Sequence, residues 1–120
     1  MIFKRDEGFR YTFSQPIPAI FTFHQINDRE VKSSPGMADI IDISPEGMRI
    51  SSKLLIPDIG ADVVLTLKFK LNGEELTFDG KIVWYKEMGK LTEYGINLIV
   101  DDSEKDIIIK ELKVFSKNNS

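Results

Sequence analysis

Hydrophobic and polar residues alternate along several stretches of the chain, which is the pattern of β-strands with one buried face. The clearest stretch is VVLTLKFKL, whose apolar positions are Val63, Leu65, Leu67, Phe69 and Leu71. Asn72 and Gly73 follow, a dipeptide that favours the type I′ turn because both residues tolerate positive φ. The pattern therefore predicts a β-hairpin around residues 72–73.

The return strand of this hairpin and a third stretch, YGINLIV, alternate in the same way. The positions assigned to the core are Leu76, Phe78, Ile82 and Trp84 in the return strand, and Tyr94, Ile96, Leu98 and Val100 in the third. For Trp84 there is an alternative, in which its ring edges a ligand site. Gly95 indicates a bulge or a close approach of backbone.

The first half of the chain also predicts strands. Residues 16–26 form one, with Pro16 and Pro18 at its start, where a missing N–H is tolerated. Residues 37–43 and 47–52 form a hairpin, because the intervening SPEG suits a type I turn.

Within that hairpin, alternation assigns Ile41 and Ile43 to one face and Asp42 and Ser44 to the outer wall. Arg49, on the return strand, is also assigned outward.

The C-terminal part changes to a helical period. Ile108, Leu112 and Phe115 recur at i, i+4 and i+7, and Ser103 is the expected N-cap of a helix over 103–116. Together the patterns predict an all-β fold, a small six-stranded antiparallel β-barrel with one C-terminal α-helix.

Length and composition fit one domain over residues 1–120, with an N-terminal arm at 1–13 and the barrel at 16–100. The net charge of −3 argues against a broad basic face for long nucleic acid. No apolar run approaches the ~20 residues of a membrane span, and the N-terminus lacks a secretory h-region. We therefore expect a cytoplasmic protein without membrane insertion.

Two segments carry candidate chemistry. The first is D-x-S-x-x-G, which is Asp42, Ser44 and Gly47, and its simpler explanation is that these groups only bond the N–H groups of their own turn. The second is the arm, with Lys4, Arg5 and Arg10. Arginine suits planar, bidentate capture of phosphate oxygens or of a guanine edge. The simpler explanation here is a solvated run of charges.

The arginine-bearing arm, the D-x-S-x-x-G hairpin, the strands GKIVW and YGINL and the closing helix together resemble the PilZ family over nearly the whole chain. The resemblance implies a PilZ-like split barrel, and many members are bacterial receptors for the second messenger cyclic di-GMP. It implies a site in two halves, R-x-x-x-R on the arm and [D/N]-x-S-x-x-G on the hairpin. Carried over, the ligand-binding residues are Arg5, Arg10, Asp42, Ser44 and Gly47, with Lys4 and Arg49 as additional candidates.

The first half departs from the family pattern, because Arg5 and Arg10 are five positions apart instead of four and Asp6 stands at the expected place. Either the arm bulges by one residue so that Arg5 fills this place, or the site is degraded. The first alternative predicts a cyclic di-GMP receptor that acts through an unidentified protein partner. The second predicts a protein–protein adaptor that binds no nucleotide.

Two other function classes have less support. An enzyme is not expected, because the chain has one histidine, His24, no cysteine, no Gly-rich phosphate loop and no metal-ligand cluster, and no cofactor is expected. A single-strand nucleic-acid binder needs a basic groove with exposed aromatic rings. Alternation places only Tyr85 outward among the aromatic residues of the central strands.

Overall fold

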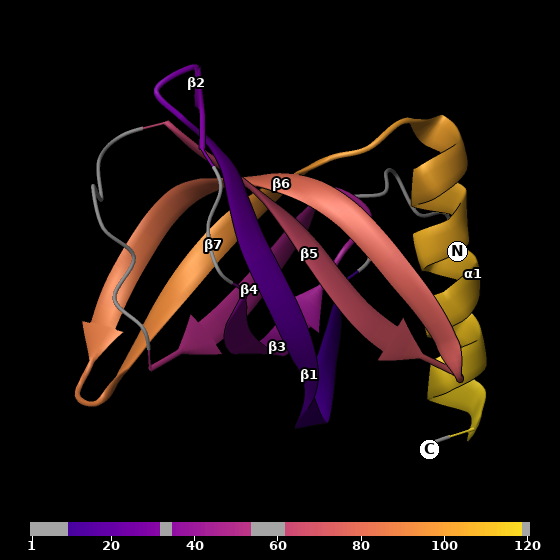
Figure 1. Cartoon of the computed structure of the whole chain (residues 1–120). Helices are drawn as coiled ribbons and strands as arrows, with labels where there is room; N and C mark the ends of the chain where they lie inside the picture. The colour runs from indigo at the N-terminus through magenta and orange to yellow at the C-terminus, as the bar shows by residue number, and fades with distance from the viewer. Residues whose placement is uncertain (1–9, 32–34, 54–61, 119–120) are drawn as a thin grey trace.

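The computed structural model describes residues 10–31, 35–53 and 62–118. It contains seven strands and one helix (Figure 1). Their bounds are β1 (Tyr11–Ile26), β2 (Arg29–Glu30), β3 (Gly36–Ile43), β4 (Gly47–Ser52), β5 (Val63–Leu71), β6 (Glu74–Met88), β7 (Leu91–Ile99) and α1 (Asp102–Asn118).

The six long strands form a closed antiparallel barrel. Their order is β1-β3-β4-β7-β6-β5, and β5 pairs back with β1, so that each long strand has two neighbours. The two-residue β2 pairs with β1. The predicted six-stranded barrel with a C-terminal helix is therefore confirmed.

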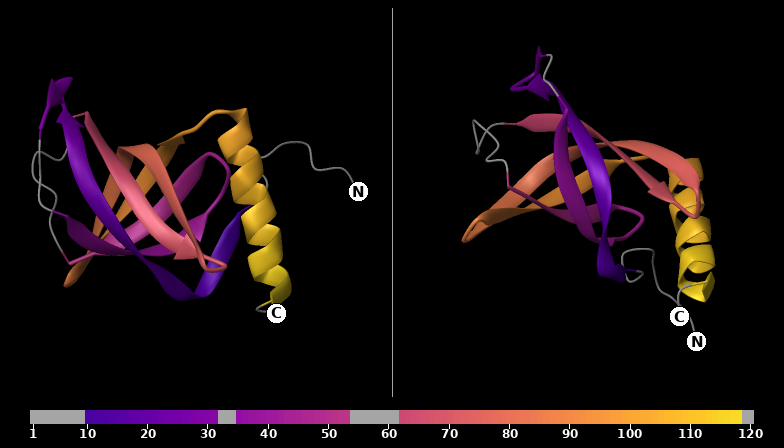
Figure 2. Two further views of the ribbon diagram at one scale, coloured as in Figure 1. Left: turned by 45° about the vertical axis from the view of Figure 1, so that its right-hand side comes forward. Right: turned by 60° about the horizontal axis from the view of Figure 1, so that its bottom comes forward.

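The barrel interior holds the apolar faces that alternation predicts for β5 and β7. Leu65, Leu67 and Tyr94 have no exposed surface. Helix α1 stands across one end of the barrel (Figure 2) and buries Ile108 and Leu112 in the same core. This burial explains the helical period of the C-terminal sequence, since one stripe of α1 faces apolar neighbours.

The first strand begins at Tyr11, five residues earlier than predicted, so residues 11–13 belong to the barrel instead of the arm. The pairing of β1 with β3 shifts register between Thr12 and Ile17, and Pro16 falls within this irregular stretch. Pro18 precedes Ala19, where β5 begins to pair with β1. Both prolines therefore lie where a missing N–H breaks little of the ladder.

Bulges in β3 and β6 change the side-chain directions that alternation predicts. A register shift between Ile40 and Asp42 puts Ile40 inward with Ile43 and leaves Ile41 half-buried. A second shift, between Ile82 and Trp84, turns Trp84 outward, where it is 45% exposed. Assigning Trp84 to the core was wrong, because one extra residue in a strand reverses the alternation beyond it.

The helix begins at Asp102, and its N-cap is Asp101 instead of Ser103. The Asp101 carboxylate accepts hydrogen bonds from the Ser103 hydroxyl at 2.7 Å and from the Glu104 N–H at 2.8 Å. The Glu104 carboxylate accepts in turn from the Asp101 N–H at 3.1 Å, which completes a capping box. The bond from Ser103, and then that from Glu104, lowers the pKa of Asp101. Among the described residues, no helix has the length and apolar character that crossing a membrane requires.

Candidate ligand-binding site

A hollow of about 620 Å³ lies on the outer surface of β3, β4, β7 and β6. Polar side chains from before β1, from β3, β4 and their turn, and from β7 line it, namely Arg10, Asp42, Ser44, Glu46, Arg49 and Asn97. The exposed apolar side chains of Val83 and Trp84 line it from β6, with Gly95 on the neighbouring strand β7. This volume is within the usual range for small-molecule sites.

The register of the sheet explains why these residues meet. Asp42 pairs with Arg49 across β3 and β4, and Arg49 pairs with Gly95 across β4 and β7. Gly95 pairs in turn with Trp84 on β6. Because directly paired residues point to the same side of a sheet, Asp42, Arg49, Gly95 and Trp84 form one row across four strands, which we call the cross-strand row.

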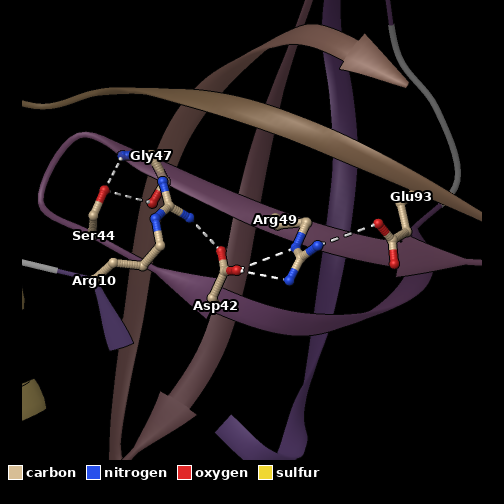
Figure 3. A network of polar contacts seen from close by, with 6 residues as sticks. All are labelled: Arg10, Asp42, Ser44, Gly47, Arg49 and Glu93. Carbon is tan, nitrogen blue, oxygen red and sulfur yellow. Dashed lines mark hydrogen bonds and ion pairs between the residues drawn. The ribbon is translucent and has the colours of Figure 1, made fainter. Parts of the chain in front are cut away.

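Two arginines hold the buried carboxylate of Asp42 (Figure 3). Arg10 Nη1 contacts Oδ1, and Arg49 contacts Oδ2 through Nε at 3.1 Å and Nη2 at 3.0 Å. The Asp42 side chain is 5% exposed, whereas the side chains of Arg10 and Arg49 are 50% and 37% exposed. A carboxylate this deeply buried needs such cations, and the guanidinium groups remain accessible from the hollow.

Arg10 reaches this position because it directly precedes β1, where Thr12 pairs with Asp42. Arg49 is also 3.6 Å from a carboxylate oxygen of Glu93 on β7. The outward predictions for Asp42 and Ser44 therefore need one correction. Both are on the hollow side of the sheet, but they are buried beneath neighbouring side chains.

The Ser44 hydroxyl forms hydrogen bonds within its own turn. It accepts a hydrogen bond from the Gly47 N–H at 3.1 Å and donates to the Gly47 carbonyl at 3.3 Å. The simpler explanation of the motif thus holds for Ser44. It does not hold for Asp42, whose bonds go to Arg10 before β1 and to Arg49 on β4.

Gly47 keeps space open beside the turn. A Cβ atom at this position would be 3.3 Å from the carbonyl oxygen of Ile96 and 3.9 Å from Arg10 Nη2. Any larger residue would project toward the guanidinium group and narrow the hollow.

Trp84 is the residue that alternation missed. Its indole covers Gly95, so that a Cβ atom at position 95 would meet the indole nitrogen at 2.0 Å. The close approach at Gly95 is therefore made by an aromatic side chain instead of a backbone segment, and the glycine was the signal in the sequence that could have located the ring.

The structure brings Arg10, Asp42, Ser44, Gly47 and Arg49 together at the hollow. The predicted residues Lys4 and Arg5, like most of the arm, lie outside the described residues. His24 is elsewhere, 3.6 Å from Asp79. Within the described ranges, no group of three or more His, Cys, Asp or Glu side chains could hold a metal ion.

Comparisons with known proteins bear on this geometry. A crystal structure of the PilZ domain of CeSA from a cellulose synthesizing bacterium matches with a TM-score of 0.62 at 14% sequence identity. The match covers 93% of this chain and 99% of that one, and at this identity it speaks for the fold alone. A search of the curated proteins found no match. The family model of the PilZ domain matches residues 6–114, and the chain therefore belongs to the PilZ domain family.

Proposed function

We propose that the protein is a receptor for cyclic di-GMP, which binds in the hollow. The observation that carries the proposal is the pair of arginines around Asp42, next to the turn formed by Ser44 and Gly47. Binding of this nucleotide is typical of PilZ domains, which are receptor domains without catalytic activity.

The donors of the arginines are only partly used by Asp42. A guanidinium group has five N–H donors, and the contacts to Asp42 engage Nη1 of Arg10 and Nε and Nη2 of Arg49. Arg49 Nη1 also lies 3.6 Å from a carboxylate oxygen of Glu93. The other remaining donors suit the phosphate oxygens or guanine edge of the ligand. In this proposal, Asp42 orients both arginines and Gly47 leaves room for the ligand. From the arm, Arg5 adds a further contact, with Lys4 next to it as an additional candidate.

A receptor without catalysis acts by changing what it binds. Ligand that gathers Arg10, the β3–β4 turn and the arm at one place would alter the surface around the hollow. We therefore propose that the output is a changed affinity for a protein partner, with the whole chain as one receptor domain in the cytoplasm.

One observation favours the second candidate, an adaptor that binds no nucleotide. Arginines of the protein contact both carboxylate oxygens of Asp42, and the Ser44 hydroxyl is engaged in its turn. These groups thus have partners within the protein itself. The displaced spacing of Arg5 and Arg10 points the same way.

Calorimetric titration of cyclic di-GMP into the purified chain separates the two candidates. We expect saturable binding that is lost in Arg10→Ala and Asp42→Ala, and weakened in Arg5→Ala if the arm reaches the site. Arg29→Ala is the matched control, because Arg29 is an exposed arginine on β2 outside the hollow. Absence of binding at about 100 μM protein would limit the affinity to weaker than roughly −5.5 kcal/mol and would favour the adaptor.

A further inference from the structure

We propose that the indole of Trp84 is the surface on which one purine base of the ligand stacks. This inference rests on the proposed function and adds a residue that neither half of the sequence motif contains. It starts from the difference between the two sides of the hollow. The arginines lie on the side of β3 and β4, whereas Val83 and Trp84 on β6 supply exposed apolar side chains.

This division matches the chemistry of a nucleotide. Phosphate oxygens bind to arginine, whereas a purine ring is flat and apolar on its faces and stacks on aromatic side chains. A site made only of Arg10, Asp42, Ser44 and Arg49 has no aromatic surface for a base. Among the described residues, Trp84 is the aromatic side chain that lines the hollow.

The cross-strand row sets the distance between the indole of Trp84 and the guanidinium group of Arg49. Arg49 pairs with Gly95, and the indole of Trp84 lies over Gly95, so the ring is next to Arg49 along the row. Neighbouring strands are about 4.8 Å apart. A base on the indole would therefore leave its sugar and phosphate within reach of Arg49.

The position of Trp84 is fixed by its neighbours, and much of its side chain remains exposed to solvent. The bulge between Ile82 and Trp84 turns the side chain out of the core, and the missing Cβ of Gly95 leaves a seat for the indole. With its ring against Gly95, the residue keeps 45% of its surface exposed. A fixed aromatic ring needs little further ordering when a base stacks on it.

The first experiment uses Trp84 as its own reporter, since it is the one tryptophan of the chain. Cyclic di-GMP is titrated into the unmodified protein while tryptophan emission and its quenching by acrylamide are measured. We expect the emission to change with the binding isotherm and the indole to become protected from acrylamide. Calorimetric binding with no change in either signal would overturn the inference.

The second experiment compares variants. Trp84→Leu keeps an apolar side chain but removes the aromatic face, and Trp84→Phe keeps a smaller one. We expect Trp84→Leu to weaken binding about 10- to 100-fold, as for loss of one stacked base, and Trp84→Phe to weaken it less. Tyr85→Leu is the control, because Tyr85 is an adjacent, 44% exposed aromatic residue that does not line the hollow.

The possible failures are distinguishable. If the unmodified protein and Trp84→Leu bind with the same affinity, the receptor function stands and the stacking role is wrong. The stacking role is equally wrong if Tyr85→Leu weakens binding as much as Trp84→Leu, since that would indicate a general effect on the β6–β7 hairpin. If the unmodified protein binds no cyclic di-GMP, the proposed function fails and the stacking role fails with it. Thermal unfolding of each variant identifies any that does not fold.

Discussion

At the scale of single residues, Asp42 combines deep burial with a carboxylate that needs polar partners. It is a charged side chain beneath the surface, and its two oxygens are shared between an arginine before β1 and an arginine on β4. The Arg10 contact joins segments 32 residues apart, and the Arg49 contact joins the two strands of one hairpin. Asp42 therefore stabilises the fold as well as shaping the hollow.

We predict that Asp42→Asn lowers the free energy of unfolding by about 1–3 kcal/mol, because the amide cannot replace a carboxylate between two cations. Part of the loss is offset, since both guanidinium groups are partly exposed and regain water. Urea unfolding measures the change. Asp39→Asn, at an exposed position on the same strand, should change stability by less than about 0.5 kcal/mol. Equal effects of the two substitutions would contradict a structural role for the arginine contacts.

Sequence reasoning identified Asp42, Ser44, Gly47, Arg10 and Arg49 as candidates, and all five meet at the hollow. It could not determine that the Ser44 hydroxyl would bond its own turn while Asp42 would bond to arginines. Both outcomes use ordinary hydrogen bonds of similar strength. The choice depends on which side chains the barrel brings near, and this is set by long-range pairing.

At the scale of elements, alternation and turn chemistry predicted β3 to β7 and α1 within a few residues. The errors occur at bulges, which shift Ile41 and Trp84 from their expected faces. A bulge adds one residue to one strand, and the local composition scarcely records it. The start of β1 was missed for a related reason, because prolines usually mark strand ends.

The capping box of α1 gives a prediction about pH. The hydrogen bonds from Ser103 and Glu104 lower the pKa of Asp101 in the folded state below its ordinary value of 3.8. The charged carboxylate therefore stabilises the fold above that value, and the stabilisation disappears as the pH falls through the lower, folded pKa. Asp101→Asn keeps a capping oxygen but removes the charge.

We expect Asp101→Asn to be less stable than the unmodified protein at neutral pH, with the difference shrinking toward zero below about pH 4. Urea unfolding at a series of pH values measures this. Asp106→Asn is the control, because Asp106 is exposed on the same helix beyond the capping box. A difference that does not depend on pH would show that the charge of Asp101 contributes nothing.

At the scale of the whole molecule, the barrel and the helix share a core. Leu112 of α1 is completely buried, and Phe115 makes edge contacts with Tyr11 and Phe13, at ring distances of 5.7 and 5.3 Å. The β5–β6 turn is also attached to α1, because the Asn72 amide donates to the Glu111 carbonyl at 2.8 Å. We therefore expect the helix and the barrel to unfold as one unit.

Leu112→Ala should lower the free energy of unfolding by about 2–5 kcal/mol through the cavity it leaves. The fluorescence emission of Trp84 on β6 reports on the barrel, and far-ultraviolet circular dichroism reports on the helix. Both signals should follow one common unfolding transition. Val114→Ala, at a 39% exposed position of α1, should have little effect. Separate transitions for the two signals would mean that the helix detaches before the barrel unfolds.

The double pairing of β1 has a consequence for the order of synthesis. This strand leaves the ribosome first, and β3 soon covers one of its edges. Its other edge pairs with β5, where Phe21 faces Leu67, so that edge stays open until much later parts of the chain have been made. Contacts so distant in sequence form slowly, and an unpaired strand invites association with other chains in the meantime. Closure of the barrel through β1 and β5 pairs both edges of every long strand in the folded protein. The same closure leaves one edge of β1 unpaired for a long time during translation.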